Sequence, residues 1–365
     1  MKAKKVLSTV LVMAMVAALA GCGGNAASKP AETKPEAATE EKSEAGKEAS
    51  GDAKTDASGA EYEIIFASHN STGTVCNDAM DKFAELVVEK SNGRIACTTY
   101  PDAVLGTEID DMQMIKTGEI TMTFFGDNFC SQLAPTTDPT IIPYIFSTVE
   151  DMKAVYSDPT VGPMIADSVK KACNGYVIGL QDRLPRNLTA KKEITDPSQL
   201  KGLKIRVPEI PQWVTVWNAM GAVTTVVDWS ECYTALQTGV VDAEENPIDS
   251  VYSAKIYEVN PYMMNTEHMK CVWRWVINCD FFDSLPEDLQ QIVKECSEEA
   301  CDYGNKILPE SGDKIYKELE DDGKLTRVDV DQAAFKEAAQ PGIEAVLKDY
   351  EPAVQEYVEN YLATH

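Results

Sequence analysis

From Tyr62 onward, hydrophobic and polar positions alternate as expected for short strands followed by amphipathic helices. Residues 62–67 predict a strand, and apolar residues then recur at intervals of three and four between Cys76 and Val87, which predicts a helix with one buried face. Asn92 and Gly93 end this helix, and a second strand is expected over 94–100. The chain therefore opens with a β-α-β unit, which predicts an α/β fold.

The same alternation continues toward the carboxyl terminus. Further strands are predicted over 120–125, 176–180 and 263–278. Further helices are predicted over 107–118, 149–157 and 161–173. A long helix is expected to begin near Pro286 and to run past Cys301, and an amphipathic helix is expected over 333–362.

The segment 201–247 predicts a strand, a capped helix and a second strand in one unit. Alternation over 203–207 predicts a half-buried strand that Pro208 ends, which leaves Arg206 close to the carboxyl end of the strand. Asp228 and Glu231 then predict a capping box for a helix that ends at Gly239. Residues 240–242 follow as a predicted strand, and 243–247 as a polar turn.

That turn places Asn246 beside Arg206 as a candidate receptor for a carboxylate. A guanidinium fork matches both carboxylate oxygens, and an amide supplies a further donor. The residues alone also allow a plainer interpretation, in which Arg206 lies on a solvated strand face and Asn246 starts a turn. Glu244 and Glu245, which precede Asn246 in the sequence, are expected to be solvated rather than catalytic.

Other polar residues follow predicted strands. His69 and Asn70 come after the first strand, and Asp127 and Asn128 after the third. The segment 182–189 carries Arg186 beside a proline and is interpreted as a crossing between two lobes, although a solvated loop arginine is equally compatible with the residues. The aromatic ring of Trp229 can stack on a sugar. A sugar acid is therefore the weakly favoured class of ligand.

The first 60 residues have a different character. Lysines at 2, 4 and 5 precede an apolar run too short to span a membrane, so 1–21 is predicted to be a lipoprotein signal peptide. Leu19-Ala20-Gly21-Cys22 resembles a bacterial lipobox, in which Cys22 receives lipid. Residues 22–60 lack large apolar side chains and are expected to be a disordered tether to the outer face of the cell membrane.

Charge and motifs exclude several classes of protein. Removing the three signal-peptide lysines takes the formal charge from −26 to −29, which argues against binding nucleic acid. Nine cysteines other than Cys22 form an odd, scattered set that is expected to lie in the core. The sequence contains no hydrolase elbow, zinc signature, phosphate loop or dinucleotide loop, so we expect no enzymatic activity, metal or cofactor.

From Tyr62 to its end, the chain resembles the DctP-type solute-binding proteins of tripartite ATP-independent periplasmic (TRAP) transporters. The resemblance is carried in order by Lys82-Phe83-Ala84-Glu85, Ser91-Asn92-Gly93-Arg94-Ile95, Leu105-Gly106 with Glu108, 203–208, 233–242 and Asn246-Pro247. It implies two α/β lobes of the periplasmic-binding-protein type, with an interlobe cleft and a long helix spanning both lobes. Expected boundaries are 61–183 with 272–311 for lobe I, and 184–271 with 312–365 for lobe II.

The resemblance also implies roles for individual residues. Arg206 is expected to form a salt bridge to the ligand carboxylate, with Asn246 on the same group, Arg186 as a second cation and Glu108 at the polar end of the ligand. The family usually has Gly and Gln where this chain has Ala243 and Glu244. The implied protein is a monomeric extracytoplasmic receptor that delivers a small organic acid to a small and a large membrane subunit. A lipoprotein hydrolase acting on a carbohydrate and a surface interaction lipoprotein are the alternatives.

Overall fold

The computed structural model describes residues 59–365, so the signal peptide, Cys22 and nearly all of the tether lie outside the described residues. The strands within this part are β1 Tyr62–Ala67, β2 Ile95–Tyr100, β3 Met122–Phe125, β4 Gly175–Ala190, β5 Lys204–Val207, β6 Val223–Val226, β7 Ala243–Asn246, β8 Tyr262–Asn278 and β9 Thr326–Val328. The α-helices are α1 Val75–Lys90, α2 Glu108–Thr117, α3 Asn128–Leu133, α4 Val149–Ser157, α5 Val161–Cys173, α6 Pro211–Ala219, α7 Trp229–Thr238, α8 Ile248–Ser253, α9 Cys279–Ser284, α10 Glu287–Asp321, α11 Gln332–Leu347 and α12 Pro352–Leu362.

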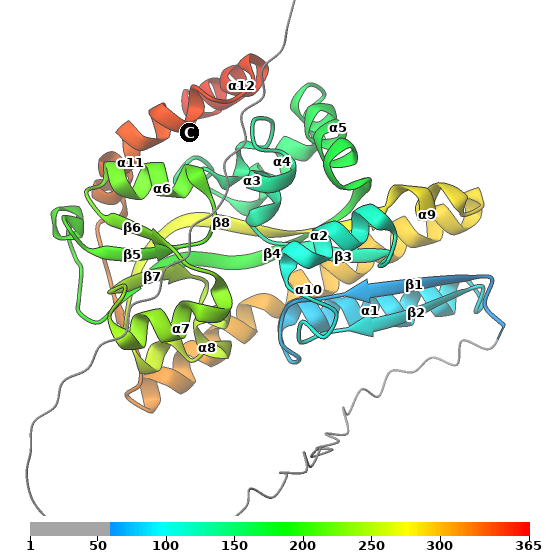
Figure 1. Cartoon of the computed structure of the whole chain (residues 1–365), viewed down its shortest axis with the longest axis horizontal. Helices are drawn as coiled ribbons and strands as arrows, with labels where there is room; N and C mark the ends of the chain where they lie inside the picture. Colours follow the sequence, from blue (N-terminus) through cyan, green and yellow to red (C-terminus); the bar gives the residue numbers. More distant parts are fainter. Residues whose placement is uncertain (1–58) are drawn as a thin grey trace, which may run out of the picture. The chain divides into compact units, whose positions relative to one another are not determined.

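All described strands belong to one mixed sheet in the order β2-β1-β3-β8-β4-β7-β5-β6, with β9 paired to β8 (Figure 1). At the lobe I end, β1 is parallel to both β2 and β3. At the lobe II end, β5 is parallel to both β6 and β7. The long antiparallel strands β4 and β8 join the two groups, which confirms the α/β class expected from the sequence.

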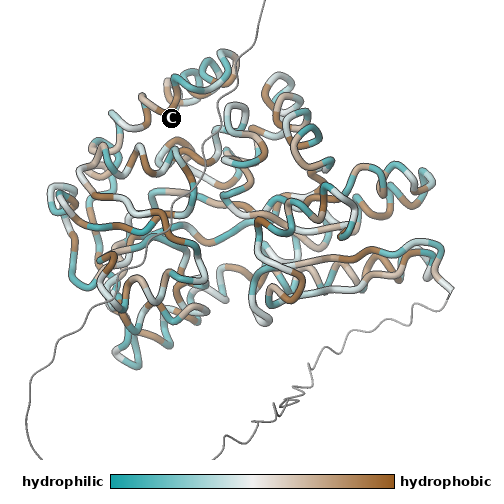
Figure 2. Tube along the Cα trace, viewed as in Figure 1, coloured by the Kyte–Doolittle hydropathy of each residue, from teal (hydrophilic) through white to brown (hydrophobic). Residues whose placement is uncertain are grey.

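Helices cover the sheet because their apolar faces need a partner. In Figure 2 hydrophobic and hydrophilic positions alternate along most helices, as expected when one face packs on the core and the other meets solvent. The lobe I core contains edge-to-face contacts among Phe66, Phe83 and Trp275, with ring centroids 5.1–5.9 Å apart. The nine described cysteines are all buried, as the sequence predicts.

Three segments run from one lobe to the other. Strands β4 and β8 lose their regular register between Arg183 and Arg186 and again before Leu188, within the segment predicted to be the crossing. Helix α10 contacts α1 in lobe I and α8 in lobe II, so it is the long helix predicted to span both lobes. Pro309 lies inside α10, where it removes one helical hydrogen bond.

No helix within 59–365 is both long enough and apolar enough to cross a membrane.

The capping box predicted for α7 is only half formed among the described residues, because Asp228 accepts from Ser230 N at 2.9 Å but Glu231 makes no return hydrogen bond. Two predictions about the bounds of elements are wrong. The strand predicted over 240–242 is displaced, because the four residues Ala243–Asn246 assigned to a polar turn form β7 and are all buried. The single helix predicted over 333–362 is two helices, α11 and α12, separated where Tyr350 is buried and Pro352 begins a new helix.

Candidate ligand-binding site

The carboxyl ends of the parallel strands in the two lobes point toward each other. Strand β3 ends at Phe125, which pairs with Arg274 of β8, and Arg274 in turn pairs with Leu180 of β4. Strand β7 runs in the opposite direction to β3 and ends at Asn246, which pairs with Asn187 of β4. Ligands bind outside the carboxyl ends of strands in open α/β sheets. The crossing segment of β4 between these two ends is therefore the expected place for a ligand.

Arg206 lies near the carboxyl end of β5 and is only 3% exposed. Its Nε donates to Val227 O at 2.9 Å, and its guanidinium carbon lies 5.5 Å from the ring centroid of Trp229. Neither Nη atom has a hydrogen bond, and no carboxylate forms a salt bridge with this side chain, among the residues described. A buried arginine without a salt bridge is costly, so this fork is suited to an incoming anion.

Asn246 ends β7 and lies next to a buried carboxylate. Its Nδ2 donates to Glu244 Oε2 at 2.6 Å, while Thr189 Oγ1 donates to Glu244 Oε1 at 2.6 Å. Burial raises the pKa of Glu244, and the charge of Glu245 adds to this effect, although both hydrogen bonds and Arg206 oppose it. Asn246 keeps one amide hydrogen that Glu244 does not use, which leaves a donor for a ligand.

Arg186 is held by an internal acid. Its Nε and Nη2 form a forked contact with Glu245, at 2.6 Å to Oε2 and 2.9 Å to Oε1, and Nη2 also donates to the backbone oxygen of Glu245 at 2.6 Å. Burial alone would raise the pKa of Glu245, but Arg186 and a hydrogen bond with His268 outweigh it and lower this pKa to about 2. The prediction that Glu244 and Glu245 lie in a solvated turn is wrong, since both are fully buried, and the burial of Glu245 is explained by this pairing.

Three arginines contact the Asp127 carboxylate just beyond the end of β3. Its Oδ2 accepts from Arg183 Nη1 and from Arg186 Nη1, each at 3.1 Å, and Arg274 Nη1 lies 3.6 Å from Oδ1. All four side chains are buried. Asp127 therefore contacts three cations, of which Arg186 also pairs with Glu245.

The remaining predicted residues gather at the lobe I strand ends. Glu108 accepts from Gly126 N and from Asn128 Nδ2, both at 2.7 Å. His69 contacts Asn70, with Nδ2 of the amide 3.3 Å from Nε2 of the ring. The predicted residues thus form two groups, one around Arg206 and one around Asp127, with no direct hydrogen bond between Arg206 and Arg186 among the described residues.

Arg183 and Trp273 were not predicted as candidate site residues, and the ion pair of Glu245 was not predicted either. The Arg183 guanidinium carbon lies 3.8 Å from the ring centroid of Trp273. Arg183 and Arg186 each donate to the Asp127 carboxylate at the same distance, 3.1 Å. The sequence does show two arginines flanking Pro185, and this pair is the signal that could have drawn attention to Arg183.

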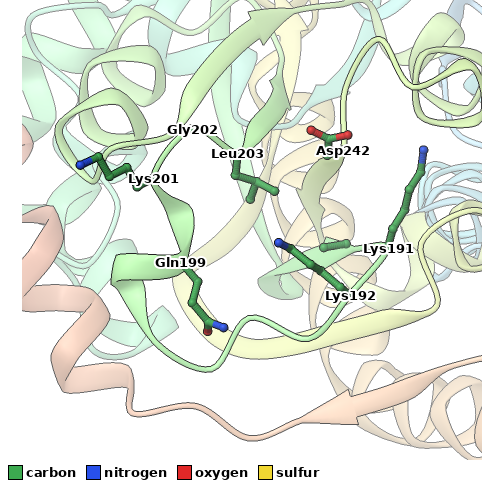
Figure 3. A pocket seen from close by; sticks show the side chains of 8 residues that line it. Lys191, Lys192, Gln199, Lys201, Gly202, Leu203 and Asp242 are labelled. Atoms are coloured by element: carbon green, nitrogen blue, oxygen red, sulfur yellow. The ribbon is translucent and has the colours of Figure 1, made fainter.

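Two hollows of similar size lie elsewhere. One of about 340 Å³ is lined by residues of lobe II, where Lys192 points into the hollow and Lys201 points away from it (Figure 3). This hollow contains none of the predicted site residues. The other, of about 390 Å³, lies between residues 71–75, α8 and α10, beside the loop that carries His69 and Asn70.

Within 59–365 no group of three or more His, Cys, Asp or Glu residues could hold a metal ion.

Comparisons with known proteins agree on the family. The sequence profile of the bacterial extracellular solute-binding protein family 7, named DctP, matches residues 66–349. A solute-binding protein of Roseobacter denitrificans, RD1_1052, is 35% identical over 75% of this chain and 84% of its own length. The 2,3-diketo-L-gulonate-binding periplasmic protein YiaO of Escherichia coli is 29% identical over 71% of this chain and 79% of its own length.

The fold comparison gives the same result. A crystal structure of the Roseobacter denitrificans TRAP protein with bound L-galactonate has a TM-score of 0.74 at 31% identity, covering 83% of this chain and 99% of that chain. The family consists of extracytoplasmic transport receptors rather than enzymes, and they bind small organic acids for membrane subunits. The matched region includes both lobes and most of the chain. The chain therefore belongs to family 7 of the bacterial extracellular solute-binding proteins, the DctP-type receptors of TRAP transporters.

Proposed function

We propose that this receptor captures a sugar acid by its carboxylate and carries it to the membrane subunits of a TRAP transporter. The observation that carries this proposal is the buried Arg206 fork, whose Nη atoms have no partner among the described residues. A carboxylate on both nitrogens would form a bidentate pair, the strongest arrangement available to an arginine. Related proteins with bound L-galactonate and β-D-galacturonate support the ligand class.

The neighbouring residues fit this role. Asn246 has an amide hydrogen available for the same carboxylate, and Trp229, 37% exposed, offers a ring face beside Arg206 for a sugar. Arg186 is already neutralised by Glu245, so we propose that it acts as a second donor near the ligand and not as the main counter-ion. His69, Asn70, Glu108, Asp127 and Asn128 are proposed to contact hydroxyl groups from the lobe I side.

Ligand binding is proposed to favour closure of the two lobes about the crossing segments. An anion that pairs with Arg206 removes the cost of an uncompensated buried charge. It stabilises the closed arrangement of the lobes only if it interacts more favourably with the closed than with the open arrangement.

We also propose that the boundaries between the two lobes lie at 183/184, 271/272 and 311/312, that the mature protein is a monomer, and that lipid on Cys22 holds it at the membrane.

A thermal-shift screen of sugar acids tests the proposal. An acid at 100 times its dissociation constant should raise the free energy of unfolding of the parent protein by about 2.7 kcal/mol. The same acid should give no shift with Arg206→Ala and a reduced shift with Arg206→Lys, which keeps the charge but not the fork. Arg327→Ala is the control, because this arginine lies at the surface and pairs with Glu320. Equal shifts in the parent and Arg206→Ala would refute the proposal.

A further inference from the structure

Two buried polar atoms at the lobe I strand ends have unused hydrogen-bonding capacity. Nε of Arg183 and Nδ1 of His69 are buried and have no hydrogen-bond partner among residues 59–365. Arg183 as a whole is 8% exposed, so water does not reach it freely. Buried polar groups in folded proteins are almost always paired, and two unpaired atoms in one cluster indicate a missing partner.

Both side chains rest on the same aromatic ring. The Arg183 guanidinium carbon lies 3.8 Å from the ring centroid of Trp273, and the His69 ring lies 5.8 Å from Trp273, centroid to centroid. Arg183 is also held by its hydrogen bond to Asp127, and a Cβ atom at position 126, where the chain has Gly126, would lie 3.0 Å from its Nη1. The two unpaired atoms therefore belong to side chains that both contact Trp273.

Both unpaired atoms are donors. The amide nitrogen of Asn70 has only hydrogens to offer, so its 3.3 Å contact makes Nε2 of His69 the acceptor. Burial lowers the pKa of His69, which favours the neutral ring, and in a neutral ring the other nitrogen carries the hydrogen. Nε of Arg183 is always a donor. A partner that satisfies both atoms must be an acceptor oxygen.

We propose that Arg183 and His69 form a subsite for an oxygen atom at the end of the sugar acid remote from its carboxylate. The proposal rests on the function proposed above, because Arg206 and Asn246 then hold the carboxylate at the lobe II strand ends. The strand ends of lobe I face them across the crossing segment, so the ligand presents its far end to Arg183 and His69. Arg183 is thus a specificity-determining residue.

A hydroxyl group fits this subsite better than a methyl group. It accepts from the two donors, whereas a methyl group would leave both donors buried and unpaired. The probes are L-galactonate and L-fuconate, which share the carboxylate and four hydroxyl groups and differ only in the terminal CH₂OH or CH₃. Titration calorimetry on the parent protein should give at least about tenfold tighter binding of L-galactonate.

Two variants test which side chain reads the terminal oxygen. Arg183→Lys keeps a cation beside Asp127 but removes the Nε donor, and it should lower the preference for L-galactonate to about twofold or less while L-fuconate binding stays within about twofold of the parent value. His69→Phe keeps a ring against Trp273 and should also reduce the preference. Arg94→Lys is the matched control at a partly exposed lobe I position, where the arginine pairs with Glu61 and Asp288, and should keep the full preference.

The outcomes separate this inference from the proposed function. If the parent binds both acids equally, or if Arg183→Lys keeps the parent preference, the subsite is refuted while the receptor function stands. An equal loss for both acids in Arg183→Lys would show only a structural role and would also refute it. If the parent binds no sugar acid at all, the proposed function fails first. Melting temperatures of all variants within a few degrees of the parent establish that each has folded.

Discussion

At the scale of single residues, two adjacent glutamates show how local partners decide the state of a buried carboxyl group. Glu244 and Glu245 are both fully buried in β7. Burial works against ionisation of both, but Glu245 has a forked contact with Arg186 that lowers its pKa to about 2, whereas Glu244 has two neutral donors and a raised pKa. The side chains of adjacent strand residues point to opposite faces, so neighbours in sequence meet different partners.

The raised pKa of Glu244 predicts a pH dependence for ligand binding. As the pH rises through its folded pKa, Glu244 becomes charged and partly offsets Arg206, so affinity for an anion should fall. Glu244→Gln should remove this fall and bind the acid more tightly at pH 8, by on the order of 1 kcal/mol or about fivefold. Titration calorimetry at pH 5 and pH 8 measures both effects.

The raised pKa of Glu244 also predicts that the protein loses stability as the pH rises. The unfolded carboxyl ionises near 4.5, so stability contributed by the protonated folded form is present at low pH and is lost as the pH rises through the raised folded pKa. Glu244→Gln should therefore gain stability over the parent at pH 8 and show less gain near pH 4.5. Glu337→Gln, at an exposed position of α11, should change neither quantity. A pH-independent difference between parent and Glu244→Gln would contradict this explanation.

Some residues of the candidate site followed from the sequence and others could not. Arg206 was predicted near the carboxyl end of a short strand and Asn246 in the turn after another, and the resemblance pointed to both; they lie near the end of β5 and at the end of β7. Arg183 was missed because residues three apart in a regular strand point to opposite faces. The register shift between Arg183 and Arg186 turns both toward Asp127, and irregular strand pairing of this kind leaves little trace in the sequence.

At the scale of elements, the close contact between α10 and β4 within lobe I depends on a small residue. Gly304 of α10 faces Gln181 of β4, whose Oε1 accepts from Trp275 Nε1 at 3.2 Å. A Cβ atom on Gly304 would lie 3.0 Å from Gln181 Cδ and 3.2 Å from Ala79 Cβ. The helix and the strand approach as closely as they do because Gly304 has no side chain.

Gly304→Ala should therefore destabilise the protein despite the higher helix propensity of alanine. Alanine favours a helix by up to about 1 kcal/mol over glycine, but displacing the buried Gln181 should cost about 1–3 kcal/mol. We expect a net loss of on the order of 1 kcal/mol in the free energy of unfolding, measured by urea denaturation. Asp302→Ala, on the exposed face of the same helix, should stay within about 0.5 kcal/mol of the parent. A stabilised Gly304→Ala would show that the interface is looser than described.

Most elements were predictable where local signals agree with packing. β1, α4 and α5 have the predicted bounds, because hydrophobic periodicity and turn residues mark both of their ends. β7 was displaced because Glu244, Glu245 and Asn246 are typical of a solvated turn, while their partners Thr189 and Arg186 lie about 60 residues earlier on β4. A strand of charged residues is stable in the interior only through such distant partners.

At the scale of the whole molecule, a strongly acidic protein concentrates buried arginines where its two groups of parallel strands meet. The formal charge of −26 repels anions at a distance, so Arg206, Arg183 and Arg186 must act locally. Strands β4 and β8 and helix α10 connect the lobes around these residues. A ligand anion that pairs with Arg206 and touches lobe I would therefore link both lobes directly.

A crystal structure of the protein with a bound sugar acid tests the central claim most directly. We predict one carboxylate with its two oxygens about 2.7–2.9 Å from Nη1 and Nη2 of Arg206, a further contact from Asn246, and the opposite end of the acid beside Arg183. A complex in which the acid is bound elsewhere, with both Arg206 Nη atoms still without an anion, would contradict the account.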